Sequence, residues 1–298
     1  MAVYKRTYKA YRGALTPGWS RFTVLARYGF GNLFESRLFT AYTAFCLIPS
    51  LVGLVFVYLV NSTAVQALLG IRMGSAFQVN GFWFLNFLSA QTWMSFILTA
   101  WGAPGMISKD FANHSIQLYL SRPLSRTEYL LGKVSGLVAL LSCTTWIPVM
   151  IVFFVQAQLA GHGWLWENLW IARAIFVSGM LWIVLMCLIA LALSVWVRWR
   201  IAATALMFAV FFVLPGFGFA LSIVLRTRWG WLLNLVHTLT MVSGDLFHVP
   251  LGRLQPGGGG RLGGIVPLWA DWASLLAVCA FCLWLLNRKL KAREVERG

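Results

Sequence analysis

The chain has 298 residues, of which 60% are hydrophobic and only 11% are charged, and its mean hydropathy is +0.76. This number of charged residues is too small to form the surface of a water-soluble protein. We therefore expect an all-α membrane protein whose main solvent is lipid. The net charge of +16 does not indicate nucleic-acid binding, because the basic residues lie in short loops and tails beside apolar runs.

Residues 1–38 are expected to form a cytoplasmic N-terminus without a cleavable signal peptide. Seven basic side chains lie in the first 37 residues, and no apolar core of a signal peptide accompanies them. Apolar residues recur there at helical spacing, with arginines elsewhere around the wheel. This pattern predicts an amphipathic helix lying in the headgroup layer. Its apolar members are Phe22, Leu25, Ala26, Phe30, Leu33 and Phe34.

Six apolar runs are long enough to cross the hydrocarbon core, which takes about 20 helical residues. A further apolar run, 229–244, is too short for a comfortable crossing. We expect it to be a re-entrant or interfacial segment within an extracytoplasmic loop, 222–266. The six predicted transmembrane helices cover residues 39–60, 81–102, 134–166, 174–197, 201–222 and 266–286.

The distribution of basic residues predicts the orientation of these helices. With six spans and a cytoplasmic N-terminus, 18 of the 24 basic residues lie on the cytoplasmic side. Cytoplasmic loops of membrane proteins carry such an excess of lysine and arginine. A seventh crossing at 229–244 would move the basic C-terminal tail outside. We therefore expect a multi-pass protein of the cell (inner or plasma) membrane with both termini in the cytoplasm.

The longest strongly polar cytoplasmic stretch, 103–131, joins the second and third spans. Ser108 is expected to cap a short helix there, with Asp110 in its first turn, where the helix dipole favours a negative charge. Pro123 disfavours helical geometry at Arg122 and is expected to end that helix.

The third span is expected to begin directly after this turn. Ser125 and Glu128 have the S-x-x-E spacing of a capping box, and Leu124 and Tyr129 are placed to form its hydrophobic staple. A rigid elbow of this kind could transmit force from a partner into the membrane helices. It could equally be a well-capped connection, and physical chemistry alone leaves both interpretations open.

The run from Gly105 to Lys133 resembles the loop after the second span of type-2 (ABC-2-like, exporter-type) ABC transporter permeases. In that family G-x-x-x-x-[DE] is followed by a leucine-rich stretch, S-x-P-x-S-R-x-x-[YF] and a closing G-K. The resemblance extends more loosely to the six-span plan and the long outer loop. It implies a permease whose elbow is a coupling helix seated in a separate ATP-binding subunit. The coupling residues that it implies are Asp110, Arg122, Pro123, Ser125, Arg126, Glu128, Gly132 and Lys133.

The sequence contains no ATP-binding motif of its own. Nothing fits G-x-x-x-x-G-K-[ST], because the only Gly-Lys pair, Gly132–Lys133, is followed by valine. We therefore expect no enzyme activity, cofactor or metal in this chain, with ATP and Mg on a partner subunit. Residues 258–263 match G-x-G-x-x-G but lie in the outer loop, where they are expected to be a flexible linker. Cys279 and Cys282 lie within an apolar run, so we interpret them as small packing residues.

Polar residues inside the spans are few. Gln91, Ser95 and Thr99 follow one another at i, i+4 and i+8 on the second span and form one stripe. They could line a substrate path, but interhelical hydrogen bonding is the favoured interpretation. Secondary transport is not favoured, because the ionisable residues Arg173 and Asp271 lie near outer ends of the spans rather than at the midplane.

Two functions follow. In the first, residues 1–298 form a single permease domain of an ATP-binding cassette transporter. It pairs with ABC ATPase subunits and a second permease copy or paralogue, and it moves an unidentified substrate. The family resemblance implies that this movement is outward. In the second, the chain is a non-transporting membrane anchor or mechanotransmission subunit, and 222–266 contacts an extracytoplasmic partner. The substrate cannot be read from the sequence, because no charged pocket is visible in the spans.

Overall fold

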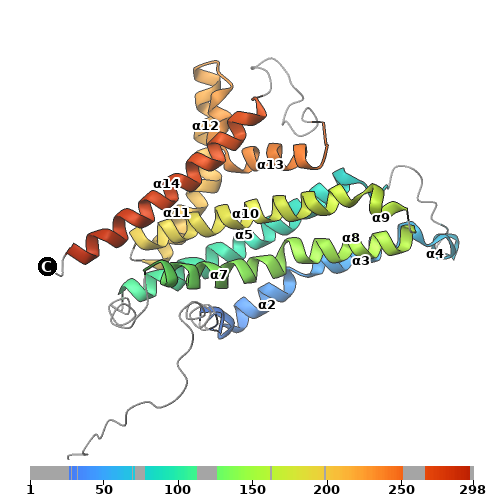
Figure 1. The fold of residues 1–298 in the computed structure, drawn as a ribbon, viewed down its shortest axis with the longest axis horizontal. Helices are drawn as coiled ribbons and strands as arrows, with labels where there is room; N and C mark the ends of the chain where they lie inside the picture. Colours follow the sequence, from blue (N-terminus) through green and yellow to red (C-terminus); the bar gives the residue numbers. More distant parts are fainter. Residues whose placement is uncertain are drawn as a thin grey trace, which may run out of the picture.

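The computed structural model describes residues 27, 29–31, 33–68, 70, 78–112, 126–161, 163–197, 199–250 and 266–295, and every element in them is helical (Figure 1). Most are α-helices; η3 is a π-helix and η4 a 3₁₀ helix. The helices are α2 (Arg37–Phe45), α3 (Ile48–Asn61), α4 (Thr63–Leu68), α5 (Gly81–Ala112), α7 (Arg126–Thr144), α8 (Trp146–Ala160), α9 (Trp164–Glu167), α10 (Leu169–Trp196), α11 (Arg200–Phe208), η3 (Ala209–Val213), α12 (Leu214–Val224), η4 (Trp229–Leu233), α13 (Leu235–Leu246) and α14 (Leu268–Val295).

Five helical stretches of the described residues are long and apolar enough to cross a membrane, so the chain is a multi-pass membrane protein. They match the first, third, fourth, fifth and sixth predicted spans. The second is present as the 32-residue helix α5, but it is not among the five, because polar side chains such as Asn86 and Gln91 lower its hydropathy. The five stretches are Arg37–Asn61, Leu130–Ala160, Leu169–Trp196, Arg200–Val224 and Leu268–Lys289.

Prolines account for the places where the long helices bend or break. Proline has no backbone N–H, and its ring clashes with the carbonyl four residues earlier. Pro49 and Pro215 lie in the first turns of α3 and α12, which follow a break and a π-helical turn respectively. Pro148 likewise follows the irregular backbone at Thr145 that separates α7 from α8. Three of the predicted spans are therefore interrupted rather than continuous α-helices.

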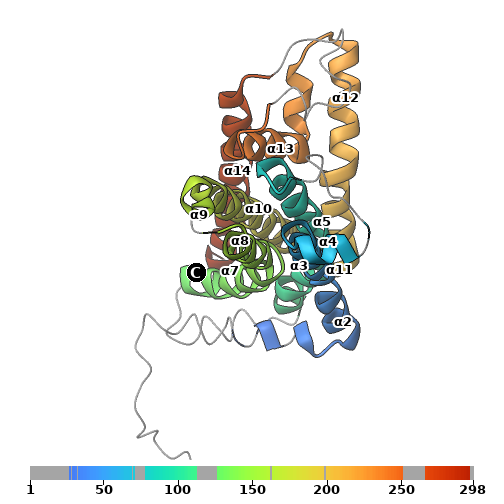
Figure 2. The same cartoon turned by 90° about the vertical axis from the view of Figure 1, so that its right-hand side faces the viewer.

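Helices α5 and α10 lie side by side at the centre of the bundle (Figures 1 and 2). One buried cluster includes Phe96 of α5 and Ile183 of α10 and extends to α7 and α14. A second cluster includes Phe84 of α5 and Phe153 of α8 and extends to α3. The core of the bundle is thus the interface between α5 and α10, which pack along most of their length.

The later helices form a second group that crosses this bundle. Helices α11–α12 and α14 run steeply across it, and α13 lies between them against α10 (Figure 2). Helix α12 packs very closely on η4, because a Cβ atom on Gly218 would lie 2.5 Å from the carbonyl oxygen of Gly230. The predicted short helical segment 229–244 is thus present, as η4 and the 12-residue α13.

The structure corrects one prediction in the polar loop. Helix α5 continues through Ala112, so Ser108 lies inside a helix and does not cap a new one. After Gly105, residues 106–112 contain no further glycine or proline that would end the helix.

The N-terminal segment is described only in part. Phe30, Leu33 and Phe34 pack against the buried cluster next to Phe39, and Arg27 is exposed. Phe22, Leu25 and Ala26 lie outside the described residues. The described apolar face therefore contacts the bundle, and its position in the headgroup layer stays a prediction.

Candidate functional site

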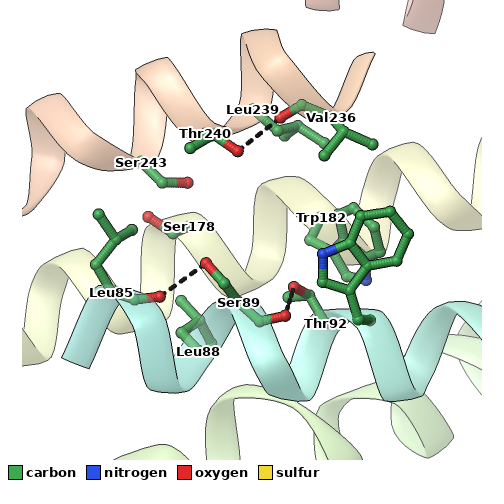
Figure 3. Close-up of a pocket in the computed structure, with 11 residues that line it drawn as sticks. Leu85, Leu88, Ser89, Thr92, Ser178, Trp182, Val236, Leu239, Thr240 and Ser243 are labelled. Carbon is green, nitrogen blue, oxygen red and sulfur yellow. Dashed lines mark hydrogen bonds between the residues drawn. The ribbon is translucent and has the colours of Figure 1, made fainter. Parts of the chain in front are cut away.

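A cavity of about 60 Å³ lies between α5, α10 and α13 (Figure 3). It is bounded by apolar side chains, two tryptophans and five hydroxyl groups, and none of these described lining residues is charged. Ser89 and Ser178 from one side and Ser243 from the other point into the same space (Figure 3). The lining residues are Leu85, Leu88, Ser89, Thr92, Trp93, Ser178, Trp182, Val236, Leu239, Thr240 and Ser243.

Three of the hydroxyl groups use their hydrogen within their own helix. Ser89 Oγ donates to the carbonyl oxygen of Leu85 at 2.8 Å, and Thr92 Oγ1 donates to that of Ser89 at 2.7 Å. Thr240 Oγ1 of α13 donates to the carbonyl oxygen of Val236 at 2.7 Å. Each of these oxygens keeps lone pairs that can accept a hydrogen bond from another group.

Ser178 differs from the other hydroxyl residues. Its side chain is only 3% exposed, and its Oγ atom has no hydrogen-bond partner among the described residues. A buried hydroxyl without a partner loses the free energy of its hydration without compensation, so such groups usually have a ligand or an ordered water. Ser178 is therefore the polar group in the cavity wall that most needs a partner.

Trp182 connects the cavity to the predicted polar stripe of α5. Its Nε1 donates to Ser95 Oγ at 3.0 Å, and Ser95 Oγ donates in turn to the carbonyl oxygen of Thr92 at 2.8 Å. With its N–H satisfied, the Trp182 indole presents carbon atoms to the cavity. This contact holds α5 and α10 together behind the cavity wall.

The stripe itself does not line the cavity. Gln91, Ser95 and Thr99 are each 0% exposed. Gln91 Nε2 donates to Ser50 Oγ of α3, and Thr99 Oγ1 donates to the Ser95 carbonyl oxygen at 2.8 Å. Gln91, through Ser50, and Ser95, through Trp182, thus form hydrogen bonds between helices. A path-lining role for the stripe stays a prediction.

The coupling residues implied by the resemblance are described only in part. Arg122, Pro123 and Ser125 lie outside the described residues. Helix α7 is described from Arg126 onward, so the capping role predicted for Ser125 stays a prediction. Asp110 lies within α5, Glu128 is half-buried, and Gly132 and Lys133 are buried in α7. The structure leaves their role in coupling as a prediction.

Sequence reasoning missed a junction between α5 and α11, directly before the polar loop. Pro104 cannot donate to the carbonyl oxygen of Ala100, and Thr204 Oγ1 of α11 lies 3.0 Å from that oxygen. The same hydroxyl lies 3.1 Å from the Arg200 carbonyl oxygen of its own helix, so its one hydrogen is shared between the two acceptors. The carbonyl oxygen of Trp101, the residue after Ala100, accepts a hydrogen bond from Arg200 Nη2 at 2.8 Å. The proline in α5 was the available signal, because a carbonyl that loses its helical donor needs another one nearby.

No group of three or more His, Cys, Asp or Glu side chains that could hold a metal ion occurs among the described residues. Cys279 and Cys282 are free cysteines of α14, and Cys282 is buried in the main apolar cluster.

Comparisons with known proteins identify the family of the chain. Comparison with curated proteins gives no significant match. The family model described as ABC-2 family transporter protein matches residues 97–286, which run from the C-terminal half of the predicted second span to the end of the last. Because this match covers more than half of the chain, the protein belongs to the ABC-2 family of transporter membrane proteins.

Proposed function

We propose that this chain is the permease subunit of an ATP-driven exporter whose ATPase is a separate protein. The family match over residues 97–286 is the observation that carries the proposal. The absence of a phosphate-binding G-x-x-x-x-G-K-[ST] motif from the sequence supports a separate ATPase. A second permease copy or paralogue completes the membrane part.

In this proposal α5 is a sixth crossing, beside the five apolar ones. Three of its polar side chains, Gln91, Ser95 and Thr99, are buried and do not require exposure to lipid. Six crossings with both termini in the cytoplasm also agree with the distribution of basic residues. The outer loop 222–266 then includes η4 and α13, and the loop 103–131 faces the cytoplasm.

The loop 103–131 is the proposed seat of the ATPase. Helix α5 runs without interruption from the cavity at Ser89 through Pro104 into this loop. A thrust on the loop therefore acts on one end of α5, while the cavity lies against its other half. The contacts of Thr204 and Arg200 extend the same thrust to α11.

The first test is coupling to an ATPase. The full chain is co-expressed with the ATPase that co-purifies with it, and ATP hydrolysis and substrate movement are measured in vesicles. We expect the double variant Ser125→Ala/Glu128→Ala to insert and assemble normally but to uncouple hydrolysis from movement, because the start of α7 loses its caps. A double variant that transports normally would show that the loop is only a connector.

The second test is topology. A cysteine-free background carrying Ser115→Cys in the loop is expected to react with a membrane-impermeant maleimide only after the cytoplasmic side is opened. Ser62→Cys, at the end of α3, serves as the matched control and is expected to react from the outside. Reaction of Ser115→Cys from the outside would refute the proposed orientation. A correctly oriented chain that never binds an ATPase would favour the anchor function instead.

A further inference from the structure

The cavity between α5, α10 and α13 also indicates what kind of molecule it accepts. We infer that it binds the uncharged, hydroxyl-bearing head of an amphipathic molecule whose apolar tail lies outside the cavity. This inference rests on the proposed permease function and assigns its substrate class.

The first argument is hydrogen-bond complementarity. Ser89, Thr92 and Thr240 spend their hydrogens on backbone carbonyls, so their oxygens offer acceptors to the cavity. Ser178 Oγ, which has no partner, can accept or donate. A ligand that donates hydrogen bonds satisfies more of these groups than one that only accepts them.

The second argument is charge. The described lining residues carry neither an acid nor a base. A cation entering the cavity would lose its hydration without meeting an opposite charge, and an anion would face acceptor oxygens. A neutral donor, such as an alcohol, avoids both costs.

The third argument is size. A cavity of about 60 Å³ has room for about four water molecules, which is the volume of a small polar head and not of a whole lipid. Ser89 and Ser178 lie on α5 and α10, two helices that the proposed function places across the membrane. An uncharged head is less costly to hold between such helices than a charged one.

The fourth argument is the rim. Trp93 lines the cavity and is 39% exposed, and its ring centroid lies 5.9 Å from that of Phe212. Phe212 belongs to the π-helical turn η3 and is 55% exposed. π-Helical turns are frequent at functional sites. These rings form an apolar rim continuous with the cavity, on which an acyl chain can lie while its head is inside.

The test uses the full chain in nanodiscs without any ATPase. Three photoactivatable probes share one oleoyl chain bearing a diazirine: monooleoylglycerol, oleoyl lysophosphatidate and methyl oleate. We expect monooleoylglycerol to label the chain at least fivefold more than either of the others. Ser178→Ala and Thr240→Val should each reduce that labelling about fivefold, the effect of one lost hydrogen bond.

Thr238→Val is the matched control. Thr238 lies on the same helix as Thr240, is fully buried, and donates to the Leu235 carbonyl oxygen instead of lining the cavity. Equal labelling by the three probes, or an equal loss in Thr238→Val and Thr240→Val, would overturn the inference. If the chain fails to couple to an ATPase but is labelled by monooleoylglycerol as expected, only the permease function is refuted. If it couples to an ATPase but shows no preference for monooleoylglycerol, only the substrate class is refuted.

Discussion

The hydrogen bond between Thr204 and the carbonyl oxygen of Ala100 allows a direct test of why α5 and α11 stay together. Ala100 loses its helical donor because residue 104 is proline, and Thr204 Oγ1 lies 3.0 Å from its oxygen. Thr204→Val removes the hydroxyl and keeps the side-chain shape. Pro104→Ala restores a backbone N–H four residues after Ala100.

The expected magnitudes follow from this geometry. Hydrogen bonds between membrane helices contribute about 0.6 kcal/mol on average and up to about 1.7 kcal/mol. Thr204→Val leaves the carbonyl without a donor, so we expect the free energy of unfolding to fall by about 1–1.7 kcal/mol. In the Pro104→Ala background the same substitution should cost less than about 0.5 kcal/mol, because the helix then supplies the donor.

The measurement is the free energy of unfolding in bicelles by steric trapping, for the four proteins of the cycle. Thr43→Val is the matched control, because Thr43 Oγ1 donates at 2.9 Å to the carbonyl of Phe39 within its own helix. Its loss should change stability by less than about 0.5 kcal/mol, since that carbonyl keeps its helical donor. An equal cost of Thr204→Val in both backgrounds would refute the role of Pro104.

Two further predictions concern the outer helices. Gly218→Ala should lower the free energy of unfolding by about 1–3 kcal/mol, because the new methyl group would meet the backbone of Gly230. Gly216→Ala is the control and should not lower it, because the space around Gly216 is open. Thermal unfolding in detergent compares the two variants. Burial lowers the pKa of His237 in α13 below its ordinary value of 6.5, so the unfolded chain binds a proton more readily than the folded one. Stability should therefore decline as the pH falls below 6.5 towards the lowered pKa, and His237→Asn should reduce this slope in unfolding measured between pH 7.5 and 5; an unchanged slope would refute the assignment.

The apolar helices were predictable from the sequence because their signal is local. Runs such as Leu169–Trp196 are long and apolar, and lipid requires each to satisfy its own backbone hydrogen bonds. The capping box at Ser125 is a local pattern too, but Ser125 lies outside the described residues, so that cap stays a prediction. The extension of α5 to Ala112 was not predicted, because Ser108 suits a cap and a helix interior alike.

The cavity could not be predicted, because it depends on contacts far apart in the chain. Helix α5 carries polar side chains on more than one face: Gln91 and Ser95 pack within the bundle, and Ser89 and Thr92 face the cavity. Periodicity identifies such faces but not which of them meets α13. The position of α13 depends in turn on packing against α10 and α14, which no local pattern encodes.

The polarity of α5 also bears on how the protein works. A helix with this many polar groups is poorly suited to lipid on its own, so its place in the membrane depends on α3, α10 and α11 supplying partners. Those partners are Ser50 for Gln91, Trp182 for Ser95 and Thr204 for Ala100. If α5 moves during transport, each of these contacts must be exchanged for another one, because an unpaired polar group costs free energy in the membrane interior. The motion expected of α5 is therefore a step between two sets of hydrogen bonds. The acceptor oxygens of Ser89 and Thr92 supply part of one of these sets, at the cavity.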